Sequence, residues 1–220
     1  MASFTMVELF RLGGITMWPL TLFSIITVFL TLERAIFFIY HNLTMDDLTA
    51  RVSQNIKDGD FAGAEKYLSG QVKRRMGARI LLALLQHSKI EPGKTFSEHQ
   101  AEKAAETESA KCLTSLENGL NFLTALGSIS PLTGFLGTVT GMIGAFRSIA
   151  EAAEVNAQIV AGGIYEALIT TVYGLVIAIT AMIFHSLYTH LVDKFAASIE
   201  LNCSRLIIEI SEKAEDLRKK

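Results

Sequence analysis

Three long runs without charged residues constrain this chain more than any other feature. No Asp, Glu, Lys or Arg occurs in residues 12–32 or 118–146, and residues 159–190 contain only Glu166. A hydrocarbon core about 30 Å thick needs roughly 20 apolar helical residues, and each run meets that length. Buried helices of a large soluble core are the alternative, which we disfavour because core helices are usually shorter and keep a polar face. The sequence therefore predicts an all-α membrane protein with three transmembrane helices.

Basic residues near the ends of these runs predict the orientation of the chain. Arg11 and Arg147 fall on the side that holds the N-terminus and the short loop 147–158. The other side holds the long segment 33–117 and the tail 191–220, with six basic residues close to the runs: Arg34, Arg51, Lys103, Lys111, Lys194 and Arg205. Because cytoplasmic segments carry the excess of Lys and Arg, we expect a periplasmic N-terminus and a cytoplasmic C-terminus.

The segments outside the membrane are predicted to be helical. Residues 1–11 have the pattern of a short amphipathic segment at the outer surface. Residues 97–126 contain no proline and one glycine, Gly119, so we expect one continuous helix that leaves the cytoplasm and becomes the second span. Apolar residues at helical spacing make the tail 191–220 a helical extension of the third span. Such long cytoplasmic helices suit a ring of subunits better than a monomer.

Several classes of function find no support in the sequence. A net charge of −2 argues against nucleic-acid binding. Cys112 and Cys203 match no metal-ligand spacing. The chain also lacks a nucleophile–base pair, a metal motif and a phosphate-binding loop. We therefore expect no enzymatic activity, no metal and no cofactor.

Small residues form a stripe along each of the last two spans. Steps of three and four residues through the second span meet only Gly or Ser: Gly127, Ser130, Gly134, Gly137, Gly141, Gly144 and Ser148. A period of about 3.5 residues keeps such a stripe facing one neighbouring helix. The third span has a second stripe that includes Gly163 and Gly174. Small residues let helix backbones approach closely in lipid, so by itself each stripe indicates a packing seam.

Polar residues beside the stripes are the candidates for function. Pro131 is expected to kink the second span and free a carbonyl group, and Thr138 lies on the flank of its stripe. In the third span, Thr170 and Thr171 either line a polar pathway or bond the carbonyl group one turn earlier. Glu166 is a functional-site hypothesis because ionisable groups within spans are costly. It also follows the outer loop closely, where water would solvate it.

The spans lack a second acid, which limits the mechanism. Hydroxyl groups orient or relay protons but do not titrate near neutral pH. If protons pass here, a second protein has to supply the group that carries them.

Two blocks of sequence resemble a known family signature. GSISPLTGFLGTVTGMIG at 127–144 and GGIYEALITTVYGLVIAI at 162–179 are similar to the TolQ/ExbB branch of the MotA/TolQ/ExbB proton-channel family. The resemblance implies a homo-oligomeric ring, a pentamer, in the inner membrane of a Gram-negative-type bacterium. The ring encloses the spans of two copies of an ExbD/TolR-like single-span protein that carries a membrane Asp.

The resemblance also assigns roles to individual residues. Thr138 and Thr171 match the two family threonines that face the partner's Asp, and Glu166 matches the family glutamate. Pro131 matches the family proline of the second span. These matches imply a proton pathway that includes Thr138, Thr171 and Glu166. They also imply that the glycines of the stripes make room for the partner's helix, with Thr138 and Thr171 presenting a polar face to it.

The implied function is a subunit of a motor driven by the proton-motive force. It would energise a TonB- or TolA-like protein that spans the periplasm, for outer-membrane transport or envelope maintenance. Thr140 stands where the family usually has Trp, and Gly162 where Pro is common, so the subfamily and the driven process stay open. A non-energised membrane scaffold is the alternative. A flagellar-type stator is disfavoured by Glu166 and by the short cytoplasmic segment.

Overall fold

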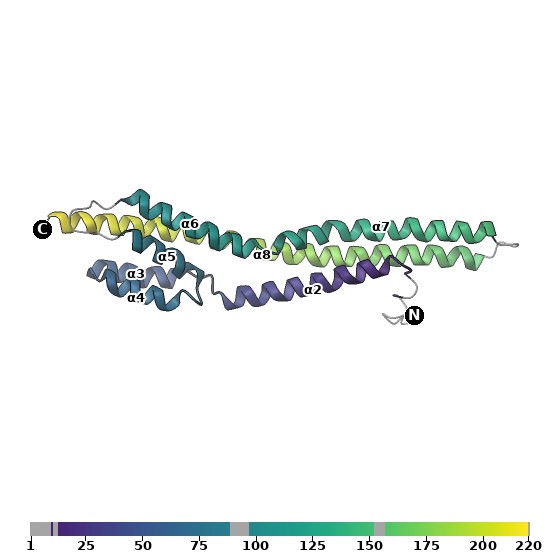
Figure 1. The fold of residues 1–220 in the computed structure, drawn as a ribbon, viewed down its shortest axis with the longest axis horizontal. Coiled ribbons are helices and arrows are strands. Elements are labelled where there is room, and N and C mark those ends of the chain that lie inside the picture. Colours follow the sequence, from purple (N-terminus) through teal and green to yellow (C-terminus); the bar gives the residue numbers. More distant parts are fainter. Residues whose placement is uncertain (1–9, 11–12, 89–96, 152–156, 220) are drawn as a thin grey trace. The chain divides into compact units, whose positions relative to one another are not determined.

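Helices make up 90% of the residues that the structure describes. The computed structural model of the protein describes residues 10, 13–88, 97–151 and 157–219 (Figure 1). Within these residues there is no strand, and three helical stretches are long and apolar enough to cross a membrane. The chain divides into two compact units, one of residues 1–34 and 119–188 and one of residues 35–118 and 189–220. We call the first the membrane unit and the second, after the side of the membrane predicted for residues 33–117, the cytoplasmic unit, and describe each by itself.

The membrane unit is built from three helices: α2 (Met17–Tyr40), α7 (Leu120–Glu151) and the first part of α8 (Ala157–Lys219). Close backbone contacts join α7 and α8. On α2, Met17 and Leu20 are buried in a cluster with Ile177 of α8. Near the other end, the Tyr188 hydroxyl donates a 2.7 Å hydrogen bond to the carbonyl group of Thr31.

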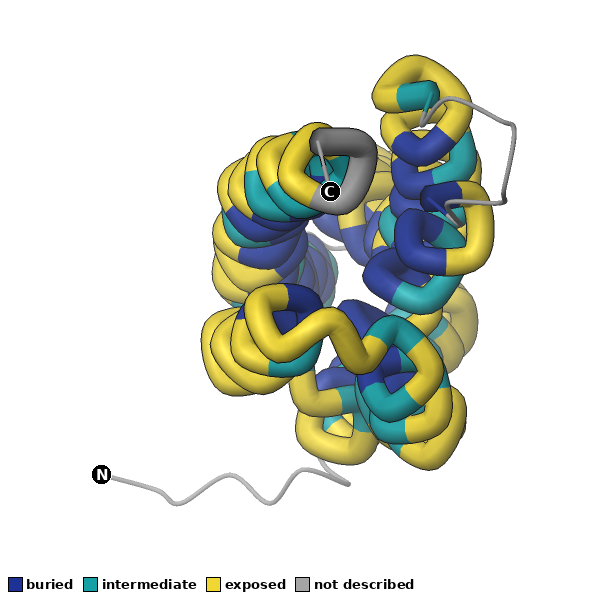
Figure 2. Tube along the Cα trace, turned by 90° about the vertical axis from the view of Figure 1, so that its left-hand side faces the viewer, coloured by how far each residue is buried: buried dark blue, intermediate teal, exposed yellow. Residues whose placement is uncertain are grey.

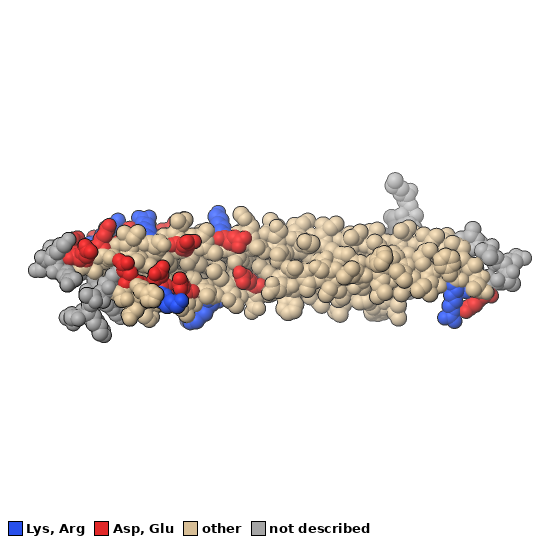
Figure 3. Space-filling model, turned by 90° about the horizontal axis from the view of Figure 1, so that it is seen from above, with Lys and Arg blue, Asp and Glu red and all other residues tan. Residues whose placement is uncertain are grey.

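The surface of the membrane unit is apolar, as expected of a protein that faces lipid or other spans. Large side chains such as Phe29 of α2, Phe135 of α7 and Val172 of α8 are exposed. The face drawn in Figure 3 has a long stretch over this unit with neither acidic nor basic side chains. The unit thus satisfies its backbone within helices and leaves apolar side chains outward, which the hydrocarbon core requires.

The helices differ in places from the predicted segments. α7 continues past residue 146, the predicted end of the second span, to Glu151. α8 is one helix from Ala157 to Lys219 and includes the tail that was predicted to extend the third span. The predicted continuous helix over 97–126 is wrong, because α6 (Glu98–Glu117) ends before α7 begins at Leu120. Except for Phe10, the predicted amphipathic segment 1–11 lies outside the described residues.

The break between α6 and α7 has a local cause at Gly119. This glycine has a φ of 92°, a conformation that side-chain-bearing residues rarely adopt. The Arg34 guanidinium lies where a side chain would otherwise stand, with its Nε 3.1 Å from the position of a Cβ at Gly119. The turn therefore needs glycine both for its backbone conformation and for the neighbouring arginine.

The cytoplasmic unit combines α3 (Asp46–Asp58), α4 (Phe61–Gln71), α5 (Met76–His87), α6 and the last part of α8. Each helix buries one side and exposes the other (Figure 2). The buried sides supply a mainly aliphatic core, whose fully buried members include Leu48, Ile56, Leu81, Leu84, Phe195 and Leu206. Amphipathic helices of this kind are stabilised mainly by burying their apolar faces together.

Candidate functional site

The centre of the membrane unit is a seam in which the backbones of α7 and α8 touch. A Cβ added at Gly134 would lie 2.8 Å from the carbonyl oxygen of Thr170 and 3.1 Å from the Cα of Thr171. A Cβ at Gly174 would lie 2.6 Å from the carbonyl oxygen of Ser130. Ordinary carbon contacts need about 3.5–4.0 Å, so these positions have no room for a methyl group.

Other small residues extend the seam in both directions. Gly127 faces the Met182 side chain, with 2.8 Å between an added Cβ and Cγ. Gly141 faces Gly163, whose carbonyl oxygen would be 3.0 Å from the added Cβ. Gly163 in turn faces the methyl group of Ala145. Since low residue numbers on α7 meet high numbers on α8, the two helices run antiparallel.

The seam departs from the predicted stripe in two respects. Gly144 has no atom within 4 Å of an added Cβ and is exposed, because the seam turns to Ala145 instead. A straight helix has 3.6 residues per turn, so a strict 3.5-residue stripe drifts off the contact line. The space beside the glycines is also filled by α8 of the same chain. The expectation that these glycines make room for a partner's helix is therefore wrong for the single subunit.

One flank of the seam faces α2 and is lined by hydroxyl groups. A Cβ at Gly137 would meet the Thr170 hydroxyl and would lie 2.9 Å from Oγ1 of Thr16. Thr170 is fully buried, and its hydroxyl lies 2.8 Å from the Ala167 carbonyl oxygen and 3.4 Å from that of Gly134. Thr16, in the turn before α2, is also buried. Sequence reasoning missed Thr16, because a residue in a turn has no helical spacing to reveal it.

Glu166 lies on this same flank, one helical turn before Thr170. Its carboxylate covers Gly14, which precedes α2 and has a φ of 64°. The Glu166 Cδ would lie 2.8 Å from a Cβ at Gly14, and its Oε1 would be closer still. Glu166 is half-buried, and its acidic group faces the start of α2.

Thr138 and Thr171 lie on the opposite flank of the seam, and both are half-buried. Successive helix residues are rotated by about 100°, which turns Thr171 away from the α2-facing Thr170 and Thr138 away from Gly137. The Thr171 hydroxyl donates to the carbonyl group of Gly134 at 3.2 Å, and Thr138 stands one turn after Gly134 on α7. The Thr138 hydroxyl donates to the Phe135 carbonyl oxygen at 2.6 Å. Thr171 thus contacts α7 one turn before Thr138, whereas the Glu166 carboxylate contacts the turn at Gly14.

Pro131 lies inside α7, where it removes one backbone donor. The carbonyl group of Gly127 consequently loses its usual partner four residues later. The neighbouring Ser130 is fully buried, and its hydroxyl has no hydrogen-bond partner among the described residues. Unsatisfied polar groups therefore gather at this point of the seam.

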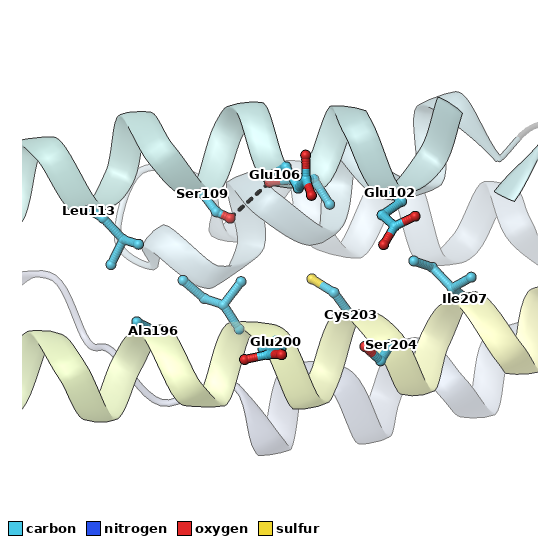
Figure 4. Close-up of a pocket in the computed structure, with 11 residues that line it drawn as sticks. Glu102, Glu106, Ser109, Leu113, Ala196, Glu200, Cys203, Ser204 and Ile207 are labelled. Atoms are coloured by element: carbon cyan, nitrogen blue, oxygen red, sulfur yellow. Dashed lines mark hydrogen bonds between the residues drawn. The ribbon is translucent and has the colours of Figure 1, made fainter. Parts of the chain in front are cut away.

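A cavity lies in the cytoplasmic unit, between α6 and α8 (Figure 4). It has a volume of about 330 Å³, and glutamates from both helices line it together with apolar residues: Glu102, Glu106, Glu200, Leu113, Ile199 and Ile207. Cys203 points into the gap, and burial raises the pKa of its thiol to about 12. That thiol is protonated at neutral pH and is a poor nucleophile. No group of three metal-binding side chains occurs in the part of the chain that the structure describes.

Comparisons with the sequences of known proteins identify a family that this chain matches. A family model described as the MotA/TolQ/ExbB proton channel family matches residues 72–201, which contain the whole seam. The chain is 34% identical over 181 residues to an ExbB-like biopolymer transport protein of Synechocystis sp., covering 81% of this chain and 82% of the relative.

Two further relatives widen the comparison. A biopolymer transport protein of Vibrio cholerae, exbB1, is 31% identical over 205 residues, 89% of this chain and 85% of the relative. The Tol-Pal system protein TolQ of Haemophilus influenzae is 46% identical over 70 residues, 32% of this chain and 31% of the relative. The relatives of this chain therefore include both ExbB and TolQ proteins.

Proposed function

This chain belongs to the MotA/TolQ/ExbB proton channel family, in its TolQ/ExbB branch, and from that premise we propose how it works. The family supports an energiser subunit of the proton-channel type. We propose that this chain forms an inner-membrane proton channel together with an ExbD/TolR-like single-span protein. The channel uses the proton-motive force to energise a TonB- or TolA-like protein for outer-membrane transport or envelope maintenance.

The feature that carries this proposal is the pair Thr138 and Thr171. Both are half-buried on the flank of the seam away from α2, in spans whose only acid is Glu166. A hydroxyl group cannot carry a proton at neutral pH, so the pair needs a titratable group from elsewhere. The membrane Asp of an ExbD/TolR-like partner supplies that group.

Each threonine hydroxyl has a single proton to donate, which makes it a two-position switch. In the single chain, Thr171 donates to the Gly134 carbonyl group and Thr138 to that of Phe135. A charged Asp of the partner draws both donations to its carboxylate, because hydrogen bonds to charged acceptors are the stronger ones. A proton from the periplasm neutralises the Asp, and the hydroxyls return to their carbonyl groups. The partner's helix is then free to shift, and release of the proton to the cytoplasm restores the charge.

The assembly follows from the same proposal. The subunits form a homo-oligomeric ring, a pentamer, around the partner's spans. The exposed apolar side chains of the membrane unit contact lipid and neighbouring subunits, and the N-terminus is periplasmic. We expect no nucleic-acid partner, no cofactor and no enzymatic activity.

Valine substitutions of the two threonines test this function. Thr138→Val and Thr171→Val keep the side-chain shape and remove the hydroxyl. A hydrogen bond to a charged group contributes about 1.5–3 kcal/mol, so each variant should slow proton-driven activity roughly 10- to 150-fold. Proton uptake in vesicles that contain the chain and its single-span partner measures the rate, and native mass spectrometry measures assembly.

Thr180→Val is the matched control, because the Thr180 hydroxyl bonds only its own helix, at Val176. Serine at 138 or 171 should restore uptake, since it restores the hydroxyl. Full activity in both valine variants would remove these residues from the pathway. A non-energised scaffold, the alternative function, predicts that a proton uncoupler leaves the protein's function untouched.

A further inference from the structure

The contact between Glu166 and Gly14 points to a role for this glutamate other than carrying the transported proton. We propose that Glu166 is a positioning residue whose carboxylate holds the turn before α2 against α8. The effect of Glu166 on proton transport rests on the proposed function. The contact between Glu166 and Gly14 rests on the geometry of the membrane unit alone.

Gly14 is fitted to this contact in two ways. Its φ of 64° lies in the left-handed region, where a side chain is strained. The Glu166 carboxylate occupies the space that a side chain at residue 14 would need. Glycine at this position therefore leaves the backbone of the turn open to the acidic group.

The start of α2 suits a negatively charged neighbour. The amide groups of a helix's first turn lack partners within the helix, and the helix dipole is positive at this end. The amides of Met17 and Trp18 reach only the carbonyl groups of Gly14 and Ile15, at 3.3 Å each. An acidic group beside the turn at Gly14 is therefore favourable, and it ties α8 to the beginning of α2.

The position of Glu166 also separates it from the predicted switch. It shares its flank with Thr170 and Thr16, whereas Thr138 and Thr171 lie on the other side of the seam. Through this anchor Glu166 sets where α2 meets the buried hydroxyls of Thr16 and Thr170. It acts on the pathway by placing helices.

The opposite end of α2 has a contact of the same kind. Arg34, the last α2 residue in the membrane unit, lies over Gly119, whose φ is 92°. The Cζ of Arg34 would be 3.4 Å from a Cβ at Gly119. A charged side chain over a glycine with positive φ thus joins α2 to the α7–α8 pair at each end, which supports an anchoring role for both.

Four variants of the full-length chain test the anchor: Glu166→Gln, Glu166→Ala, Gly14→Ala and the double variant Gly14→Ala/Glu166→Ala. Gly162→Ala is the matched control, because Gly162 is near the same end of α8 and an added Cβ meets nothing within 4 Å. The melting temperature of the purified chain in detergent reports the contact. Proton uptake against pH, in vesicles holding the chain with its single-span partner, reports the pathway.

We expect Glu166→Gln, which keeps the shape and hydrogen-bonding atoms, to stay within about twofold of wild-type uptake with an unmoved pH profile. Glu166→Ala and Gly14→Ala should each lower the melting temperature. Because the two residues touch, the melting temperature of the double variant should fall by less than the sum of the two single decreases. Gly162→Ala should keep the wild-type melting temperature and proton uptake.

A loss of uptake of about tenfold or more in Glu166→Gln at an unchanged melting temperature would overturn the proposal, because a proton carrier behaves in that way. Additive losses in the double variant, or a Gly14→Ala variant as stable as Gly162→Ala, would overturn it as well. If wild-type uptake shows no dependence on protons, the proposed function fails, while the melting temperatures still decide the contact.

Discussion

Replacing Gly134 with alanine should weaken the membrane unit, whereas the same change at Gly144 should not. Both glycines lie in α7 and in the predicted stripe, but only Gly134 touches α8. At Gly134 the added methyl group meets backbone atoms of Thr170 and Thr171, which cannot rotate aside. At Gly144 it meets no atom within 4 Å. Comparing the two variants therefore separates the effect of helix packing from the higher helix propensity of alanine, which both variants share.

The distances set the size of the effect. A methyl group 2.8 Å from the Thr170 carbonyl oxygen needs the helices to separate by roughly 0.5–1 Å to reach ordinary contact. Overpacking of this kind costs about 1–3 kcal/mol. The shift also weakens the Thr171–Gly134 hydrogen bond, which is worth about 0.6 kcal/mol for interhelical bonds in membranes. Alanine gains about 1 kcal/mol over glycine in a helix, but both variants share that gain.

We therefore expect Gly134→Ala to be about 2–3 kcal/mol less stable than Gly144→Ala. Unfolding of the purified chain in mixed micelles, followed by far-ultraviolet circular dichroism as SDS replaces the mild detergent, measures the difference. Gly144→Ala should unfold at or slightly beyond the wild-type midpoint. Equal midpoints for the two variants would refute the seam as a backbone contact between α7 and α8.

Two further predictions concern the cytoplasmic unit. Hydrogen bonds from Arg75 lower the pKa of Asp47, so their contribution to stability is full above about pH 4 and is lost as pH falls towards the lowered pKa. Arg75→Ala should thus be less stable than wild type at neutral pH, with a difference that shrinks in acid; a constant difference in pH-dependent unfolding would contradict this. With its pKa raised to about 12, Cys203 should react slowly with a maleimide until the chain is denatured. Peptide mass spectrometry reads this labelling, Ser204→Cys is the exposed control, and equal native rates at both positions would refute the burial argument.

The three spans and the small-residue seam could be predicted because membrane chemistry leaves them in the local sequence. A span must be apolar for about 20 residues, and close helices in lipid need small residues. Gly134 and Gly174 were found in this way, without any knowledge of the fold. The stripe did not reveal which helix would pack against it, because small residues allow close approach of α8 and of a partner's helix equally well.

Other features depend on contacts between distant segments. The break at Gly119 is set partly by Arg34, which is 85 positions earlier in the chain. The two flanks of the seam depend on the register of α7 against α8, so no spacing within one helix separates Glu166 from Thr171. The register of α7 against α8 is decided by the packing of the whole helix pair. The spacing of residues within one helix does not specify that register.

The antiparallel contact between α7 and α8 has a consequence for how the protein is made. Only residues 152–156 separate the two helices in the sequence, so the partners of the seam enter the membrane one after the other. Their backbones meet without help from α2 or from another chain. We expect this helical hairpin to form as soon as both helices are inserted, and α2, which precedes them in the chain, to dock onto the finished pair. In the proposed ring, the structural unit would then be the α7–α8 hairpin, and the contacts between subunits would lie between hairpins.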